Sequence, residues 1–364
     1  MQLLSILAVL AFVPFVSAAL SCKDQNNNDV DWYVGYKMPR TKDNSLQGVG
    51  NGVAFYYMDV NTDSFAPSPN DMESKDQAIA YTLEQYYSRL SDPSLFHVMY
   101  NDEVAEEALA ERMNRVRDRF INASGDAATQ FGHNKGVVVF DATGGFWLVH
   151  SIPKFPPPKA YGYPDSGTIY AQSILCMTFD YSQLGTIGTQ LFFNHPDIYS
   201  SSLPTSIAKD FGDLAKVIGG THKTGTPYTS TETLITRGNQ QFTSFAKTGD
   251  FNQDLYDVLV APTLKAPLTV ESWRRGSIIP LDCTAKYVVL DAMDMKVGTT
   301  AQFGYTHDHS KIAVSASSDA PYVCIGDINR MTSQFVRGGG TVCIKLEKLW
   351  NVYTPLFVDT NKCT

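Results

Sequence analysis

The stretch HDHSKIAVSAS, residues 307–317, places a histidine and a lysine two positions apart, directly before a run of apolar and small residues typical of a β-strand. A second stretch, FGHNKGVVVFD at residues 131–141, repeats this arrangement about half a chain length earlier. Two copies of one His-x-Lys motif at this spacing indicate two related halves that face each other across a pseudo-two-fold axis. Such a fold would bring both motifs to one shared site.

The residues of the motif are suited to phosphodiester chemistry. Alternate residues of an extended segment point to the same side, so His133 would lie beside Lys135 and His309 beside Lys311. The lysine ammonium groups would offset the negative charge of a phosphodiester, while one imidazole attacks phosphorus and the other protonates the leaving oxygen. These four residues are the predicted catalytic groups, and the predicted chemistry requires no divalent metal or other cofactor.

Two other interpretations of the same residues stay open. His307, Asp308 and His309 could be metal ligands, although Lys311 would place a positive charge beside the metal and no His-Glu-x-x-His motif accompanies them. Alternatively, both motifs could be exposed polar loops. The repetition of the motif favours the shared phosphate site over either alternative.

Strand and helix patterns are mixed along the whole chain. A hairpin is predicted at residues 135–152, where two apolar runs flank residues 141–145. Further strands are predicted at residues 29–40, 52–60, 189–195, 268–276, 286–297, 311–317 and 322–330, and a strand followed by a helix at 338–350. Helices are predicted at residues 77–90 and 104–120, within 201–220 and in part of 240–264. This mixture predicts an α/β or mixed α+β fold.

Residues 1–18 are predicted to be a secretory signal peptide. Residues 3–16 are uncharged and apolar, and the small-residue pattern Val-Ser-Ala ends at Ala18. A membrane anchor is the alternative, but the run is shorter than the ~20 apolar residues of a spanning helix, and Pro14 interrupts it. We therefore expect a chain without a membrane anchor that enters the secretory pathway.

The cysteines and a sequon fit this route. All six cysteines lie after residue 18, and an even number in a secreted chain indicates disulfides. None forms a Cys-x-x-Cys pair. Asn122, in the sequence Asn-Ala-Ser, is a predicted N-glycosylation site.

The net charge of −8 argues against a protein that binds nucleic acid through bulk positive charge at neutral pH. Protonating all seven histidines would bring the charge to −1, because each adds one positive charge. An acidic compartment would therefore remove most of the repulsion toward a polyanion.

Paired His-x-Lys motifs resemble those of the phospholipase D superfamily, and the chain is more closely similar to the deoxyribonuclease II family. The similarity covers essentially the whole mature chain, from Leu20 to Cys363. It is carried by CKDQNNNDVDWYVGYKMP, HNKGVVVFDATGGFWLVHSIPKFPP, SILC, SFAK, DHSK, CIGDINR and RGGGTVCIKLEKLW.

The resemblance implies a phospholipase D-like α/β fold of two pseudo-symmetric halves, about residues 19–200 and 201–364, each with a mixed sheet flanked by helices. It implies an acid endodeoxyribonuclease that cleaves DNA without a metal through a phosphohistidine intermediate, leaving 3′-phosphate and 5′-hydroxyl ends. His133 is then the expected nucleophile and His309 the general acid, with the reverse assignment open. The expected setting is the degradation of DNA in lysosomes or outside the cell.

The resemblance also implies a disulfide pattern and supporting residues. The implied disulfides are Cys22–Cys176, Cys283–Cys363 and Cys324–Cys343. The superfamily's Gly-Ser-x-Asn pattern is altered here to Gly326-Asp327-Ile328-Asn329, so Asp327 and Asn329 are candidate supports for the imidazoles. His150 is a further candidate, or else a core histidine.

Two alternative functions stay open beside that of a nuclease. The same fold could serve a catalytically inactive secreted protein that binds DNA or modulates immunity, or a phospholipase D-type lipid phosphodiesterase. Retention of both His-x-Lys pairs argues against an inactive protein. DNA is the expected substrate, and a homodimer is an open expectation. Arg274 and Arg275 are either contacts to the DNA backbone or a solvated strand edge.

Overall fold

A computed structural model describes residues 19–43, 45–104, 107 and 131–363. The predicted signal peptide (1–18), most of the predicted helix 104–120 and the glycosylation candidate Asn122 lie outside the described residues. None of the helices that are described has the length and apolar character needed to cross a membrane.

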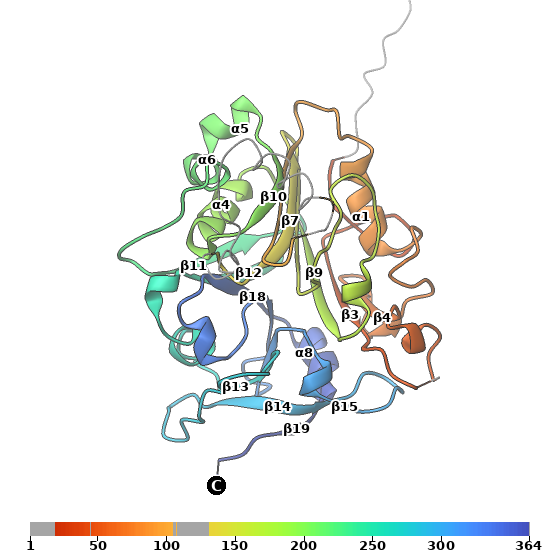
Figure 1. Cartoon of the computed structure of the whole chain (residues 1–364), viewed down its shortest axis with the longest axis vertical. Helices are drawn as coiled ribbons and strands as arrows, with labels where there is room; N and C mark the ends of the chain where they lie inside the picture. Colours follow the sequence, from red (N-terminus) through yellow and green to blue (C-terminus); the bar gives the residue numbers. More distant parts are fainter. Residues whose placement is uncertain (1–18, 44, 105–106, 108–130, 364) are drawn as a thin grey trace, which may run out of the picture.

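The first large sheet has eight antiparallel strands that come from residues 32–202 (Figure 1). Their order is β10 (Ile198–Ser202), β6 (Phe96–Asn101), β7 (Lys135–Asp141), β8 (Gly144–His150), β9 (Gln172–Phe179), β3 (Trp32–Lys37), β4 (Phe55–Asp59) and β5 (Ala66–Pro67). The predicted hairpin is confirmed, because β7 and β8 pair directly. A small separate sheet joins β1 (Cys22–Lys23) to β2 (Asp29–Val30).

The second large sheet has nine strands that come from residues 229–360. Their order is β11 (Thr229–Ile235), β12 (Gln241–Lys247), β18 (Gly339–Lys345), β17 (Tyr322–Gly326), β16 (Ile312–Ser315), β13 (Leu268–Glu271), β14 (Val289–Met295) and β15 (Phe303–Gly304), with β19 (Phe357–Thr360) paired to β14. Among the strands of this sheet that the structure describes, β13 and β14 are the parallel pair, and the other pairs are antiparallel. The chain therefore has a mixed α/β fold built of two halves, as the sequence predicts.

The helices cover the sheets on several sides. They are α1 (Ala78–Tyr87), α4 (Gln183–Asn194), α5 (Thr205–Asp210), α6 (Gly212–Ile218), α7 (Ala261–Leu264, after a π-helical turn at Tyr256–Val260) and α8 (Glu347–Tyr353). Helix α1 covers one face of the first sheet, and α4 and α6 cover the other (Figure 1).

Both faces of the first sheet are buried, and alternate residues of its strands show this. In β7, Val138 and Phe140 belong to the main core between the sheets, whereas Val137 and Val139 pack on the side of α1. Because successive side chains of a strand point to opposite faces, a strand buried on both sides reads as a continuous apolar run. The main core also takes residues of the second sheet, such as Ile325.

One predicted strand is wrong. Residues 189–195 belong to helix α4, whose buried Leu184, Ile187 and Leu191 recur at helical spacing. The three apolar residues 191–193 are the last turn of that helix, so the short run alone gave no sign of its period. The single helix predicted within 201–220 is in fact two helices, α5 and α6.

Three disulfides join Cys22 to Cys176, Cys283 to Cys363 and Cys324 to Cys343. This is the pairing that the resemblance implies. Cys324 and Cys343 are opposite residues of the neighbouring strands β17 and β18, and Cys22 ties the N-terminal segment to β9.

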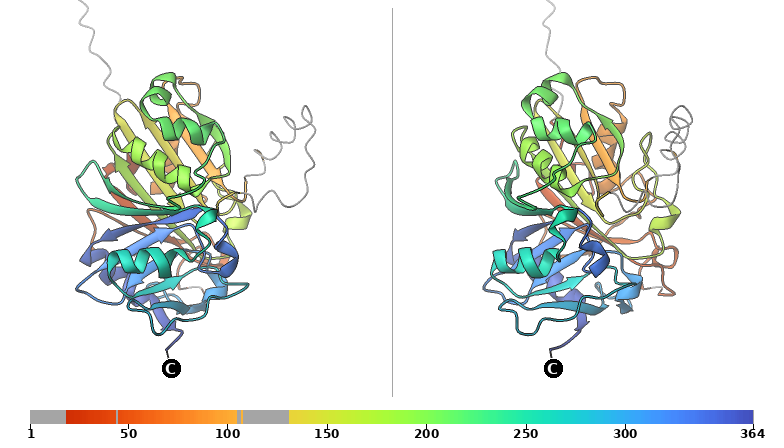
Figure 2. Two further views of the ribbon diagram at one scale, coloured as in Figure 1. Left: turned by 90° about the vertical axis from the view of Figure 1, so that its left-hand side faces the viewer. Right: turned by 60° about the vertical axis from the view of Figure 1, so that its left-hand side comes forward.

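The two halves lie against each other along a seam (Figure 2). Both His-x-Lys motifs are held across this seam; Lys135 begins β7, and Lys311 directly precedes β16. The backbone N–H of His133 donates to the carbonyl of Gly338 at 2.8 Å, and that of His309 donates to the carbonyl of Ala171 at 2.9 Å. Each motif is thus fixed by backbone of the opposite half, and this seam is where the candidate site lies.

Candidate active site

The imidazole of His133 is held in one orientation by a residue of the other half. Its Nδ1 lies 2.6 Å from the backbone carbonyl oxygen of Asp327, and its Nε2 lies 3.5 Å from Oδ2 of Asp102. A carbonyl oxygen can only accept, so Nδ1 carries the proton that it donates. In the neutral ring the lone pair is therefore on Nε2, the nitrogen that a nucleophile would use.

Asp102 is the central anion of this part of the site, and the sequence analysis missed it. Its carboxylate pairs with the ammonium of Lys135 and lies 3.3 Å from Nη2 of Arg337. Although burial alone would raise the pKa of Asp102, the charges of His133, Lys135 and Arg337 hold it well below its usual range. Asp102 thus stays ionised and orients the cations of the first motif.

His309 begins the second motif, and two aromatic rings enclose it. Tyr170 stacks on its ring at 5.9 Å between centroids, and Trp273 meets it edge-on at 4.8 Å. Burial first, and then the charges of Lys311, Lys135 and His133, lower the pKa of His309 well below its ordinary value. Both motifs therefore act electrostatically on one imidazole.

One nitrogen of His309 is available for a ligand. Its Nδ1 is buried and has no hydrogen-bond partner within the part of the chain that the structure describes. A buried polar atom without a partner costs free energy, so such an atom is typical of a site that a ligand completes.

Lys311 is fully buried, and its ammonium donates to the carbonyl oxygen of His309. Burial first, and then the charge of Lys135, lower its pKa to about 7. The two lysines thus repel each other across the site. An anion bound between them would favour the charged form of both, as expected for a phosphate-binding centre.

The side chains of His307 and Asp308 lie in different surroundings. His307 is exposed, whereas Asp308 is fully buried and accepts hydrogen bonds from the Tyr36 hydroxyl and the backbone N–H of Ser310. Asp308 therefore supports the loop that carries His309. Among the described residues, no group of three or more His, Cys, Asp or Glu side chains is arranged to hold a metal ion.

Two of the three candidate supports, Asp327 and Asn329, contact different parts of the site. Asp327 contacts His133 through its backbone, while its carboxyl group accepts the N–H of Gly340 at 3.0 Å and burial raises its pKa to about 7. The side chain of Asn329 accepts the backbone N–H of Trp273 at 3.1 Å, so it holds the aromatic neighbour of His309 rather than an imidazole.

His150 is a buried histidine at the end of β8. Its Nδ1 accepts the backbone N–H of Ile152 at 3.2 Å, and its ring meets Phe155 edge-on at 5.4 Å. Burial first, and then the charge of Lys135, lower its pKa to about 3. His150 thus packs in the protein core, where the charge of Lys135 still affects its pKa.

The two arginines of the SWRRG stretch have separate roles. Arg274 is buried and donates to backbone carbonyls, including that of Ser272 at 3.0 Å, so it stabilises its own segment. Arg275 is exposed, and its guanidinium lies 4.4 Å from the ring of Trp273 and 5.4 Å from that of Tyr170. A cation over aromatic rings therefore lies beside His309.

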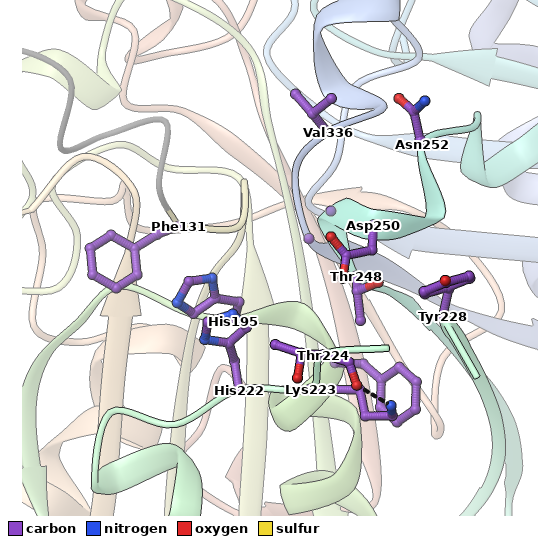
Figure 3. Close-up of a pocket in the computed structure, with 13 residues that line it drawn as sticks. Phe131, His195, His222, Lys223, Thr224, Tyr228, Thr248, Asp250, Asn252 and Val336 are labelled. Carbon is purple, nitrogen blue, oxygen red and sulfur yellow. Dashed lines mark hydrogen bonds between the residues drawn. The ribbon is translucent and has the colours of Figure 1, made fainter. Parts of the chain in front are cut away.

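A large open cavity lies between residues of the two halves of the chain (Figure 3). Its volume is about 840 Å³, and residues of both halves line it, among them Phe131, His195, His222 and Gly338. Gly338 is the residue whose carbonyl accepts the backbone N–H of His133.

Known proteins are similar to this chain over nearly its full length. The sequence model of the family described as "Deoxyribonuclease II" matches residues 21–363. Deoxyribonuclease-2 of Caenorhabditis elegans is 54% identical over 356 residues, which cover 94% of each chain. Plancitoxin-1 of Acanthaster planci is 34% identical over 99% of this chain and 97% of its own. Deoxyribonuclease-2-alpha of Rattus norvegicus is 34% identical over 98% of this chain and 97% of its own.

The match extends over nearly the full length of the chain, including both His-x-Lys motifs. The protein is an endodeoxyribonuclease, a nuclease that degrades DNA. It belongs to the deoxyribonuclease II family.

Proposed function

We propose that this enzyme cleaves DNA phosphodiesters without a metal ion, through a covalent phosphohistidine, and leaves 3′-phosphate and 5′-hydroxyl ends. The observation that carries the proposal is that both His-x-Lys motifs lie at the seam, where the backbone N–H of each histidine donates to a carbonyl of the opposite half. The charges of Lys311, Lys135 and His133 accordingly act together on His309. Lysine ammonium groups here occupy the role that a divalent cation has in other nucleases, which is to offset the charge of the phosphate oxygens.

The first step joins the phosphate to His133. Nε2 of His133 attacks phosphorus, while Nδ1 keeps its proton and donates it to the carbonyl oxygen of Asp327, which stabilises the developing positive charge of the ring. The bond from phosphorus to the 5′ oxygen breaks, and that oxygen takes a proton from His309. The 5′-hydroxyl strand is released, and the 3′ strand remains bound as a phosphoramidate.

The second step releases the other strand. Neutral His309 takes a proton from a water molecule, whose oxygen attacks phosphorus, and the bond from phosphorus to Nε2 of His133 breaks. The products are a 3′-phosphate and the free enzyme with His309 again protonated. The reverse assignment of the two histidines would give the same products.

The surroundings of the histidines support operation in acid. Burial, opposed by the charge of Asp102, lowers the pKa of His133 to about 3, so this imidazole stays neutral as a nucleophile must. His309 needs a proton although its surroundings lower its pKa, so acid and a bound phosphate anion both favour the active form. We accordingly propose action in lysosomes or outside the cell after entry into the secretory pathway. A homodimer remains a prediction.

The proposal is tested by nicking of supercoiled plasmid at about pH 5 in excess EDTA, with His133→Ala and His309→Ala beside the wild type. Activity in the wild type and its loss in both variants are expected. Activity that survives both substitutions would overturn the assignment of the site.

Two further assays address the alternative functions. A folded wild type without any cleavage, but with retained DNA binding, would favour an inactive binding protein. Release of lipid headgroups without plasmid nicking would favour a lipid phosphodiesterase.

A further inference from the structure

Two histidines outside the His-x-Lys motifs stack on each other in the large cavity. The ring centroids of His195 and His222 are 3.6 Å apart and their planes differ by 18°. Phe131 packs against the outer side of this pair, 5.0 Å from His195, as Figure 3 shows. The cavity of about 840 Å³ is large enough for a nucleotide to enter beside the rings.

This cavity is directly joined to the catalytic centre by backbone. The N–H of Gly132 donates to the carbonyl of His195 at 2.8 Å, and the N–H of the next residue, His133, donates to that of Gly338 at 2.8 Å. Both acceptor residues line the cavity. A DNA strand whose scissile phosphate lies at His133 would therefore place a neighbouring nucleotide at His195 and His222.

The pair lies at the C-terminal end of helix α4. His195 follows the last residue of α4 and donates its backbone N–H to Leu191, while Lys223, next to His222, donates its N–H to the carbonyl of Phe192 in the last turn. The carbonyl oxygens at the C-terminus of a helix attract cations. Both histidines thus lie at the negative end of α4.

The surroundings of the pair lower the pKa of His195. Burial first, and then the charge of His222, lower the pKa of His195 to about 4, and Asp250 lines the same cavity. The ammonium of Lys223 donates to three backbone carbonyls of its own loop, at residues 224–226. Two further charged groups lie close by: Asp197 lines a neighbouring cavity that His195 also lines, and the guanidinium of Arg337 forms an ion pair with Asp102.

We propose that the His195–His222 pair binds a backbone phosphate of the DNA strand next to the scissile phosphate, and that this contact forms with uptake of protons. Two positive rings at this separation repel each other in the free enzyme, and a phosphate anion offsets both charges. DNA binding therefore strengthens in acid independently of the chemical step. The inference rests on the proposed function of the neighbouring site, because it defines where the DNA strand enters.

Binding of DNA without cleavage tests the inference. The probe is a short fluorescein-labelled DNA duplex, and its Kd is measured by anisotropy in the His309→Ala background, at about pH 5 and about pH 7 over a range of salt concentrations. The test variant adds His195→Phe and His222→Phe, which keep two stacked rings but cannot be protonated. The Kd of the parent is expected to be about tenfold or more tighter in acid. The test variant should lose most of this gain, and its salt slope at about pH 5 should fall by about 1.

The outcomes separate the proposal from its competitors. Unchanged acid binding in the phenylalanine variant would overturn the phosphate contact and indicate stacking of a base on the rings. A second variant, His222→Arg, should bind tightly at both pH values, because its charge is permanent. Tyr228→Phe, on the opposite side of the same cavity, and His307→Asn, an exposed histidine outside it, are controls that should keep the parent's pH dependence.

Folding and activity are checked separately. The variants should unfold at the temperature of the parent, since loss of fold would abolish binding at both pH values alike. In the active background, the two phenylalanine substitutions should raise KM at about pH 5 and leave kcat unchanged. If the wild type does not cleave DNA at all, the proposed function fails, whereas the pH dependence of Kd still decides this inference.

Discussion

Nδ1 of His133 lies 2.6 Å from the backbone carbonyl oxygen of Asp327, so a residue of the second half fixes the tautomer of the motif histidine of the first half. The backbone of Ser151, a residue of the first half, forms a hydrogen bond with His309 in turn. The two histidines are thus held in a similar way, and the assignment of His133 as nucleophile and His309 as general acid stays a proposal that experiment decides.

DNA with sulfur in place of the 5′ bridging oxygen separates the two roles. A thiolate leaves without a proton far more readily than an alkoxide, since a thiol has a pKa near 8.5. In His309→Ala, the first cleavage of this substrate, measured in a single turnover, should recover about 10²-fold or more of the lost rate, whereas in His133→Ala it should recover none. Recovery in His133→Ala alone would reverse the assignment.

Asp102 is expected to matter for both stability and activity. Asp102→Asn leaves Lys135, His133 and Arg337 without their common anion in a buried site. Removal of one partner of a buried ion pair costs about 3–5 kcal/mol of unfolding free energy, measured by denaturant titration. The acid limb of the pH profile should also move to lower pH, because the charge of Asp102 raises the pKa of His133.

The matched control is Asp63→Asn. Asp63 lies 3.6 Å from Lys348 and its side chain is 91% exposed, so its loss should change the unfolding free energy little. Equal effects of the two substitutions would contradict the central role of Asp102.

Trp273 is expected to set the working pH through His309. Trp273→Ala removes an aromatic wall of this imidazole, and burial is the largest cause of its lowered pKa. The pKa of His309 should rise, and the alkaline limb of kcat/KM should move to higher pH by up to about one unit. Trp273→Phe keeps an aromatic neighbour and should keep the wild-type profile. A lower melting temperature with an unchanged profile would mean that Trp273 only stabilises the fold.

The two motifs and the hairpin could be predicted from the sequence because each is formed by residues that are close together along the chain. Lys135 begins a strand and Lys311 directly precedes one, as the apolar runs after them indicate. Asp102 could not be found in this way, because it reaches Lys135 only through the pairing of β6 with β7, where Asn101 lies opposite Lys135. An aspartate after an apolar run is too common a pattern to mark an active site.

The aromatic wall of His309 was missed for a similar reason. Tyr170 and Trp273 come from loops of different halves, and their rings lie 4.4 Å apart only because the seam brings these loops together. No periodic pattern connects two such residues. The sequence indicated Arg275 as a possible contact to the DNA backbone. It gave no information on the aromatic rings that lie under the guanidinium.

Asp327 should make the unfolding free energy depend on pH. Burial raises its pKa to about 7, whereas an unfolded chain has an ordinary carboxyl pKa near 3.9. Between these values the folded state holds a proton that the unfolded state has lost, so the contribution of Asp327 to stability falls as pH rises from about 4 to about 7.

Asp327→Asn resembles the protonated carboxyl group and can still accept the N–H of Gly340. The variant should match the wild type near pH 4 and be more stable by a few kcal/mol, in order of magnitude, above pH 7. Asp319→Asn, at an exposed position, is the control that should show no such trend. A variant that is less stable than the wild type above pH 7 would mean that the carboxylate at position 327 is ionised and paired in the folded protein.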